Sequence, residues 1–379
     1  MRIGIDIRTL MDARYSGVPL HNYNLVKGLL ALDRQNEYLL YYNSFGKNLE
    51  LPEFDRPNVK IIRGRYPNKL LNYLNFKILN RPKIDKRLEA DIFLMPHANF
   101  IALSGKAKSV LTIHDLSFMR FKEFFSIRKN IWHRMINVRK LIKKFDHIVA
   151  VSESTKNDII DLCGVDEKKV RVIYPGLGPE FRPLKENNSG LASVKRKYAL
   201  PDKFILYLGT LEPRKNVEGI IAGYDGLRRA GEIGGFKLVI AGGKGWKTEK
   251  IFSAYEKSRF KNDIAFIGYV KEEEKVFLYN LASLFVFPSF YEGAGLPPLE
   301  AMASGAPVLT SFTSSLPEIA GGASLMADPY NINDIRDGMK AVLCDSELRR
   351  NMVSRGLELA KKFSWEKCAS EYLSVISGL

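Results

Sequence analysis

Residues 290–308, FYEGAGLPPLEAMASGAPV, decide the fold of this chain. Proline is tolerated in the first turn of a helix but not in its interior, so Pro297 and Pro298 predict a helix that begins near them. Glu292 then lies in the loop before the helix and Glu300 in its first turn, while Gly305 predicts the helix end. The apolar, β-branched residues that follow are typical of a short strand. The stretch is therefore predicted to form a loop, a helix and a strand, with two glutamates near a helix N-terminus that favours anions.

Similar short strands alternate with helical patterns along the whole chain, which predicts parallel sheets with crossover helices. The first half offers RIGIDI, YLLYYN, VKIIRG, DIFLMP, SVLTIHD and HIVAVSES, and the second half offers FILYLGT, KLVIAGG, IAFIGYV, LFVFPS, APVLTS and SLMADP. Each set suffices for one doubly wound sheet, and such sheets bind ligands at the carboxyl ends of their strands. The turn-rich stretch of residues 174–190 predicts the domain boundary. The predicted fold class is α/β with two doubly wound domains.

The composition is that of a globular protein, with 46% hydrophobic and 26% charged residues among 379. No apolar run approaches the roughly 20 residues of a membrane span, and the N-terminal sequence is more typical of a strand than of a secretory signal. The three cysteines are odd in number and far apart, which fits a reducing compartment. We therefore expect a cytoplasmic protein.

Positive charge is concentrated in the N-terminal half. The net charge is +16, and residues 1–175 hold 31 of the 58 Lys and Arg residues but only 18 of the 42 Asp and Glu residues. The densest segment, residues 120–145, interleaves basic residues with Phe, Ile and Trp. Such a segment can lie in an anionic lipid interface, or it can be a core-packed helix with a basic, solvated face, and the sequence leaves both open. The first alternative predicts peripheral association with the inner face of the plasma membrane.

Two strand ends in the second half differ in how well they suit an anion. Gly209 follows one strand, and Arg214 and Lys215 directly precede a helix predicted to start near Asn216. Their charges and the helix dipole would add at a diphosphate. The glycines of AGGKGW, residues 241–246, lack the full spacing of a dinucleotide-binding motif, and we interpret them as a turn.

The first half offers two further candidates. Gly17 lies between the first strand and a helix, where a missing side chain lets the backbone approach a ligand. His114, followed by Asp115, lies at a strand end, which is the ligand-binding edge of such a sheet.

Other catalytic classes find no support in the sequence. It contains no G-x-S-x-G elbow, no P-loop and no D-x-D triplet, and its five histidines lack H-E-x-x-H or similar ligand spacing. A recognised nucleic-acid-binding motif is also missing. We therefore expect no metal site and no nucleic-acid partner.

Five stretches, GTLEPRKN, FIGYV, FPSFYEGAGLPPLEAMASGAPV, SLPEIAGGA and FSWEKCASEY, together resemble the retaining glycosyltransferases of family 4. The E-x7-E element in its G-L-P-x-L-E-A setting is the most specific part, and the similarity covers nearly the whole chain. The resemblance implies the GT-B fold, with two Rossmann-like domains and a cleft between them. The acceptor domain would span residues 1–180 and the nucleotide-sugar domain residues 181–357. A C-terminal helix, residues 358–379, would pack back toward the N-terminal domain.

The resemblance also implies residue roles. Arg214 and Lys215 match the pair that neutralises the donor diphosphate, and Glu300 matches the carboxylate that binds the ribose hydroxyls. Glu292 matches the carboxylate that holds the transferred sugar, and His114 matches a histidine near that sugar. The implied catalytic residues are His114, Arg214, Lys215 and Glu292. In this resemblance Tyr269 and Val270 would frame the base. Gly17 and the N–H groups of Gly295 and Leu296 would lie near phosphate. The full set of implied donor-binding residues is Gly17, Gly209, Arg214, Lys215, Tyr269, Val270, Glu292, Gly293, Ala294, Gly295, Leu296 and Glu300.

The activity implied by the resemblance is transfer of a hexose from a nucleoside diphosphate sugar to a glycan or lipid-linked acceptor. The anomeric configuration would be retained, and no metal or other cofactor is expected at the catalytic step. The stretch TIHDLSF is similar to mannosyl and related transferases of surface-polysaccharide assembly, including lipopolysaccharide, so mannose is one candidate sugar. Two alternatives remain, a sugar-nucleotide epimerase of the same fold and a noncatalytic nucleotide-sugar-binding relative.

Overall fold

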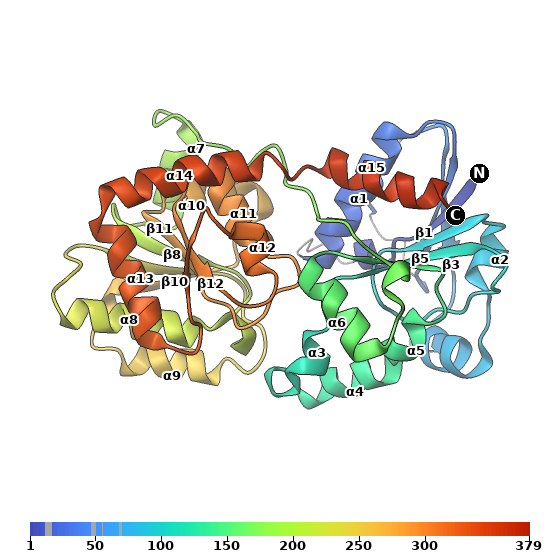
Figure 1. Ribbon diagram of the computed structural model, residues 1–379, viewed down its shortest axis with the longest axis horizontal. Helices are drawn as coiled ribbons and strands as arrows, with labels where there is room; N and C mark the ends of the chain where they lie inside the picture. Colours follow the sequence, from blue (N-terminus) through green and yellow to red (C-terminus); the bar gives the residue numbers. More distant parts are fainter. Residues whose placement is uncertain (12–16, 47–50, 55, 68–69) are drawn as a thin grey trace. The chain divides into compact units, whose positions relative to one another are not determined.

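The computed structural model describes residues 1–11, 17–46, 51–54, 56–67 and 70–379 (Figure 1). These residues divide into two compact units. Unit 1 comprises Met1–Leu116, Ile131–Gly176 and Ser364–Leu379, and unit 2 comprises Ser117–Asn130 and Leu177–Phe363.

Unit 1 is built on a seven-stranded sheet in the order β3-β2-β1-β4-β5-β6-β7, in which every pair is parallel. The strands are β1 (Arg2–Asp6), β2 (Glu37–Asn43), β3 (Val59–Gly64), β4 (Ile92–Met95), β5 (Lys108–Ile113), β6 (His147–Ala150) and β7 (Val170–Val172). The helices include α1 (Val18–Leu32), α2 (Ile84–Leu88), α5 (Val138–Ile142), α6 (Glu153–Cys163) and α15 (Trp365–Ser377). The strand order reverses between β1 and β4, which makes their carboxyl ends the expected ligand-binding edge.

The C-terminal helix α15 packs against α1, near the start of the chain. Gly28 permits this contact, because a Cβ at that position would lie 2.9 Å from the Cβ of Ala369. Buried side chains from both helices, among them Leu25, Leu29 and Tyr372, join the core of unit 1. The last helix of the chain therefore belongs to the hydrophobic core formed around its first strand and helix.

Unit 2 has a six-stranded parallel sheet in the order β10-β9-β8-β11-β12-β13. The strands are β8 (Phe204–Leu208), β9 (Lys237–Ala241), β10 (Ile264–Gly268), β11 (Leu284–Phe287), β12 (Val308–Ser311) and β13 (Leu325–Ala327). One helical layer holds α8 (Val217–Arg229), α9 (Glu249–Lys257) and α13 (Ile332–Cys344), and the other holds α7 (Ser189–Lys197), α10 (Glu272–Leu281), α11 (Leu296–Ala303) and α14 (Ser346–Ala360) (Figure 1). The short helix α12 (Leu316–Ala320) follows β12.

The predicted fold class, α/β with two parallel-sheet domains, is confirmed. Each strand expected from the sequence appears in the structure, and β7 is an additional one. That strand has only three residues, Val170–Val172, which is too short to give a periodic signal. In unit 2 the strand order reverses between β8 and β11, so the loops after these strands are the ligand-binding edge.

The basic segment of residues 120–145 has two different parts. Helix α4 (Ile127–Ile136) leaves three large apolar side chains exposed, Ile127 at 80%, Ile131 at 53% and Trp132 at 42%. After Asn137 the chain continues as α5, whose apolar side chains are buried. The segment therefore contributes to the core at Phe125 and at its C-terminal end, from Ile136 onward, while the helix between them exposes large apolar side chains. Within the described ranges, no helix is long and apolar enough to cross a membrane.

Candidate active site

The loop after β8 rests on the glycine loop after β9. Gly209 donates its N–H to the carbonyl of Ala241 at 3.0 Å, and a Cβ on Gly242 would lie 1.8 Å from the carbonyl oxygen of Gly209. Only glycine fits at Gly242, which also has a φ of +145°. Leu211 and Gly243 share a further backbone hydrogen bond of 2.9 Å. The glycines of residues 241–246 thus support the loop that carries the cationic pair.

Arg214 and Lys215 lie in a single 3-10 turn, Pro213–Lys215, directly before α8, as predicted. Asn216, in the left-handed conformation with φ of 56°, joins the turn to the helix. Its side-chain amide donates to the carbonyls of Pro288 at 3.3 Å and Pro329 at 2.7 Å. Asn216 therefore fixes the cationic turn beside the loop that follows β11, a role that the sequence did not suggest.

The two cations converge on Glu292, which lies in the loop after β11. Lys215 Nζ is 2.6 Å from Glu292 Oε1, and Arg214 Nη1 is 3.4 Å from Oε2. Arg214 also binds Glu212 Oε1 through Nη2 at 3.0 Å and the carbonyl of Tyr291 through Nη1 at 2.9 Å. We call Glu212, Arg214, Lys215 and Glu292 the donor cluster. Glu212, only 3% exposed, was missed by the sequence analysis, although its place two residues before Arg214 offered a weak signal.

Burial and charge act in opposite directions within the donor cluster. Burial alone would raise the pKa of Glu292, but the positive charges of Lys215 and Arg214 outweigh it and lower this pKa. For Lys215, burial and the neighbouring Arg214 lower the pKa, and Glu292 opposes them. Lys215 is 9% exposed and Glu292 5%, so solvent screens this ion pair little. The cluster is a preorganised, charged site at the ligand-binding edge of unit 2.

The E-x7-E stretch forms the predicted loop, helix and strand, with one correction. Gly295 adopts the left-handed conformation, φ of 63°, and caps α11, which begins at Leu296 ahead of both prolines. Glu300 is consequently the fifth helical residue and lies in the second turn, not the first. The left-handed glycine lets the helix start earlier than the prolines indicated. Gly293 and Ala294 occupy the loop between Glu292 and this cap.

Two serines hold the loop that carries Glu292. The N–H of Glu292 donates to Ser314 Oγ at 2.8 Å, and Ser315 Oγ donates to the carbonyl of Glu292 at 3.1 Å. Both serines follow β12, the strand next to β11. Neighbouring strand ends therefore fix the backbone on both sides of the Glu292 side chain.

Glu300 is buried against α10 and does not join the donor cluster. Tyr279 donates its hydroxyl to Glu300 Oε2 at 2.9 Å, and Lys275 Nζ lies 3.9 Å from the same oxygen. Tyr269 and Val270 follow β10 and precede α10; Tyr269 is 52% exposed and Val270 4%. This second group of residues lies around the α10 and α11 helices, apart from the cationic turn.

Gly17 and His114 belong to unit 1. Gly17 caps α1 with a φ of 57°, and His114 follows β5. His114 Nε2 lies 2.9 Å from the carbonyl of Pro96, which can only accept, so this nitrogen carries the proton. Burial lowers the pKa of His114, while Pro96 and Asp115 oppose the shift. In the neutral state Nδ1 of His114 is therefore an acceptor.

A further polar group at the β1 and β4 ends was not predicted. Asp6 and Arg8 form a buried ion pair of 2.6 Å, and Arg8 also donates to the carbonyl of Phe100. His97 lies beside them, and burial lowers its pKa to about 4. The signal available in the sequence was a pair of opposite charges, Asp6 and Arg8, at the end of the first apolar strand.

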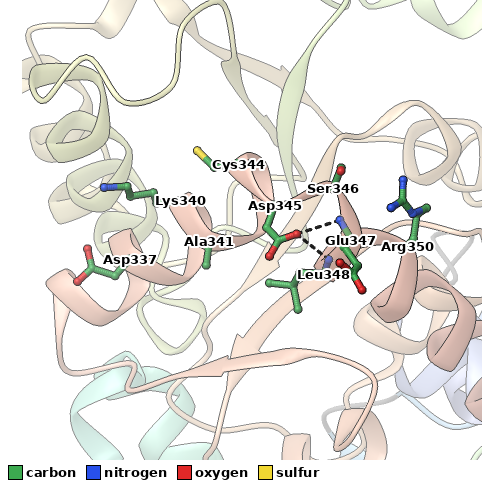
Figure 2. A pocket seen from close by; sticks show the side chains of 9 residues that line it. All are labelled: Asp337, Lys340, Ala341, Cys344, Asp345, Ser346, Glu347, Leu348 and Arg350. Atoms are coloured by element: carbon green, nitrogen blue, oxygen red, sulfur yellow. Dashed lines mark hydrogen bonds between the residues drawn. The ribbon is translucent and has the colours of Figure 1, made fainter.

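Two pockets lie outside these groups. Figure 2 shows one at the junction of α13 and α14, where Asp345 caps α14 by accepting from the N–H groups of Glu347 and Leu348 at 2.9 Å. This carboxylate is engaged in holding the helix. The second pocket, in unit 1, is lined by Arg63, Arg65, Tyr66 and Arg87. In the part of the chain that the structure describes, no cluster of three or more His, Cys, Asp or Glu side chains is placed to hold a metal ion.

Comparison with known families gives a consistent result. The profile of the family "Glycosyl transferases group 1" matches residues 193–358, and that of "Glycosyltransferase Family 4" matches residues 15–181. O-antigen chain mannosyltransferase B of Escherichia coli is 31% identical over 277 residues, covering 73% of this chain and 72% of that protein. The serotype-specific mannosyltransferase WbdA of Escherichia coli is 34% identical over 270 residues, which are 69% of this chain but only 32% of WbdA.

Solved structures share the fold at low sequence identity. A sucrose-phosphate synthase from Thermosynechococcus elongatus aligns with a TM-score of 0.76 at 18% identity, covering 100% of this chain and 98% of that one. WaaG, a glycosyltransferase involved in lipopolysaccharide biosynthesis, aligns with a TM-score of 0.72 at 15% identity, covering all of both chains. Both likenesses concern the arrangement of the backbone.

Proposed function

The chain belongs to the group 1 glycosyltransferases of family 4, and from this premise we propose that it transfers a hexose from a nucleoside diphosphate sugar with retention of anomeric configuration. The observation that carries the proposal is the donor cluster. Two adjacent cations precede a helix N-terminus, and the same cations bind a buried carboxylate. Cations at a helix N-terminus suit a diphosphate, and a carboxylate beside them suits the hydroxyls of the attached sugar.

The proposed mechanism is electrostatic. Arg214 and Lys215 stabilise the negative charge that develops on the diphosphate as the glycosidic bond breaks. The acceptor hydroxyl attacks from the same face, and the departing phosphate takes its proton. Glu292 orients the sugar and is not the nucleophile, because both of its oxygens already accept from cations and its pKa is lowered. A carboxylate held in this way is a weak nucleophile.

The remaining donor contacts follow from the positions of the other residues. We assign Glu300 to the ribose hydroxyls, since the two recorded partners among the described residues, Tyr279 and Lys275, both approach Oε2. Tyr269 and Val270 would frame the base. The N–H groups of Gly295 and Leu296, and the backbone at Gly17, would meet phosphate, with His114 near the sugar and Gly209 beneath the cationic turn.

A metal-independent reaction is part of this proposal. The departing diphosphate needs positive charge beside it in the transition state. The guanidinium of Arg214 and the ammonium of Lys215 supply two adjacent positive charges. We therefore expect full activity in the presence of EDTA, without any added cofactor.

We assign the transferred sugar to mannose and the acceptor to a glycan or lipid-linked glycan of surface-polysaccharide assembly. The names of the two mannosyltransferase relatives support this choice. An anionic acceptor group would suit the pocket of Arg63, Arg65 and Arg87. The exposed apolar side chains of α4 beside basic residues suit an anionic membrane surface, where such an acceptor would be anchored.

The test is a transfer assay with purified protein, nucleoside diphosphate mannose donors and a lipid-tailed mannoside acceptor, in EDTA. The expected product carries one added hexose whose anomeric proton shows the configuration of the donor by NMR. An inverted product would contradict retention. A changed nucleotide sugar that forms without acceptor would instead indicate an epimerase, and donor binding with no product from any acceptor would indicate a noncatalytic relative.

A further inference from the structure

Lys129 is a cation of unit 2 that has no role in the function described so far. It lies in the first turn of α4, within the segment Ser117–Asn130. Its Nζ is 3.0 Å from the centre of the Trp246 ring, and the residue is partly buried, whereas the neighbouring Arg128 is exposed. A cation over the face of an indole is attracted by the ring. Trp246 therefore fixes where this ammonium lies.

Two loops of unit 2 hold this segment. At the glycine loop after β9, Trp246 donates its Nε1–H to the carbonyl of Phe124 at 2.7 Å. At the loop after β11, the ring of Phe290 stacks on that of Phe124 with centroids 5.5 Å apart, and Tyr291 packs against Phe121 with centroids 5.8 Å apart. The first of these loops supports the cationic turn, and the second carries the buried carboxylate of the donor cluster. The segment is therefore anchored where the cluster is assembled.

The indole that holds Lys129 is connected directly to the donor cluster. Gly245, the residue before the indole, donates its N–H to the carbonyl of Leu211 at 3.0 Å, and Leu211 directly precedes Glu212. Burial lowers the pKa of Lys129, Glu212 opposes that shift, and the positive charge of Arg214 adds to it. Such shifts arise from nearby charges. The ammonium of Lys129 is therefore a third cation beside the cluster.

The donor cluster has no net positive charge of its own. Arg214 is paired with Glu212 and Glu292, and Lys215 is paired with Glu292, so that two cations face two carboxylates. The diphosphate of a nucleotide sugar adds a negative charge on each phosphate, and more negative charge develops as the glycosidic bond breaks. Charge that leaves water needs a partner of opposite sign. A third cation gives the site the positive charge that the four cluster residues lack together.

We propose that Lys129 binds the diphosphate of the donor together with Arg214 and Lys215, and that Trp246 is a positioning residue that holds its ammonium for this contact. The inference rests on the proposed function, because it takes the diphosphate from it. The basic segment of residues 120–145 then serves the reaction at Lys129, while the exposed apolar side chains of α4 remain available to a lipid surface.

Lys129→Met tests the contact, because methionine keeps the length of the side chain and its packing on the indole but removes the charge. Calorimetric titration in EDTA uses whichever of GDP, UDP and ADP binds wild type most tightly, and its parent nucleoside. The variant should bind the diphosphate about tenfold more weakly and the nucleoside as wild type does. Its diphosphate affinity should also fall less steeply with added KCl. Lys129→Arg keeps the charge and should recover most of the affinity.

Trp246→Leu tests the positioning role, because it removes the ring under the ammonium. In the wild-type background it should weaken diphosphate binding by about fivefold. Combined with Lys129→Met it should add little, since two residues that act through one contact are not additive. Arg128→Met is the matched control, because it removes a positive charge from the preceding, exposed residue of the same helix. It should bind the diphosphate and the nucleoside as wild type does.

The outcomes separate the role of Lys129 from the proposed function. Wild-type diphosphate affinity in Lys129→Met, or an equal loss for diphosphate and nucleoside, overturns the role of Lys129 and leaves the transferase intact. Additive losses in the double variant overturn the positioning role of Trp246. Failure of every nucleoside diphosphate to bind the folded wild-type protein overturns both proposals. A loss confined to the diphosphate in Lys129→Met, with recovery in Lys129→Arg, confirms the contact.

Discussion

At the scale of single residues, burial makes each charge of the donor cluster depend on an opposite charge beside it. Lys215 and Glu292 are each less than a tenth exposed, and each is the nearest opposite charge of the other. Removing one member of such a buried pair leaves the other uncompensated and costs about 3–5 kcal/mol. The pair is therefore held in place by its own charges, and a substitution at either residue is expected to disturb the other.

Glu292→Gln should separate binding from turnover. The substitution removes a negative charge from the cluster, so nucleoside diphosphate affinity should stay equal to wild type or increase. Turnover should fall by about 100-fold or more, because the sugar loses its charged partner in the transition state. Initial rates and calorimetric affinities check both parts, with Glu273→Gln, at a side chain 70% exposed on α10, as control. A variant with wild-type turnover would remove Glu292 from the mechanism.

The lowered pKa of Glu292 also predicts a pH dependence of stability. The unperturbed value is 4.5, so stabilisation by the ionised form is fully present above that pH and is lost as pH falls through the lowered pKa. Between about pH 5 and about pH 3 the thermal midpoint of wild type should therefore fall more than that of Glu292→Gln. Parallel decreases for the two proteins would show that this carboxylate is not paired in solution.

At the scale of elements, local signals located the site and packing completed it. Pro297 and Pro298 predicted the start of α11 to within one residue, because proline acts on the chain locally. The bond from Tyr279 to Glu300 joins residues 21 apart and exists only because α10 packs on α11. Sequence periodicity shows that a helix buries one face, but not which helix it meets, so Glu212, Lys275 and Asn216 could not be assigned roles in advance.

Gly295→Ala should weaken nucleotide binding as well as stability. A Cβ there would lie 3.0 Å from Leu316 Cδ2, and the left-handed backbone costs an alanine about 1–2 kcal/mol. The helix N-terminus should shift, and affinity for a nucleoside diphosphate should fall by about tenfold through its misplaced N–H groups.

The matched control for this variant is Gly305→Ala, at the other end of α11. Gly305 has a φ of +82°, and the nearest atom to an added Cβ is 3.7 Å away. This variant should lose similar stability but keep wild-type affinity, measured by thermal unfolding and calorimetry. An equal loss of affinity in both variants would mean that α11 acts only through overall stability.

The end of β4 carries a second pH-dependent group, His97. Its pKa is lowered from 6.5 to about 4 by burial, so its stabilising neutral form is fully present above pH 6.5 and is lost as pH falls toward the lowered value. At pH 5 the linkage amounts to about 2 kcal/mol. The thermal midpoint of wild type should fall between pH 7 and pH 5 by more than that of His97→Gln. Identical decreases would indicate that His97 is solvated.

At the scale of the whole molecule, the sequence predicted the two parallel sheets and nearly every strand. Alternating apolar strands and amphipathic helices are strong signals in a chain of this length. Those patterns did not predict that Ser117–Asn130 belongs to unit 2 or that the chain switches to unit 1 at Ser364–Leu379. Both assignments depend on packing between segments far apart in the chain. The same limit applies to the Asp6 and Arg8 pair at the β1 end.

Binding to anionic vesicles tests the membrane part of the proposal. Helix α4 exposes Ile127 and Trp132 beside basic residues, so the protein should sediment with vesicles containing anionic lipid and much less with neutral ones. The double substitution Ile127→Asp and Trp132→Asp should weaken this binding by about tenfold or more. Ile332→Asp, at a side chain 49% exposed on α13, is the control and should bind as wild type. Equal binding of all three proteins would contradict a role for α4.

The most direct measurement is a calorimetric titration of nucleoside diphosphate into wild type, Arg214→Ala and Lys215→Ala, all in EDTA, with the parent nucleoside as comparison. If the donor cluster binds the diphosphate without a metal, wild type binds in EDTA. Each variant should then lose about 10-fold to 100-fold in affinity for the diphosphate while its affinity for the nucleoside is unchanged. Equal diphosphate affinity in the three proteins, or binding by wild type only when a divalent metal is restored, would contradict the assignment of this site.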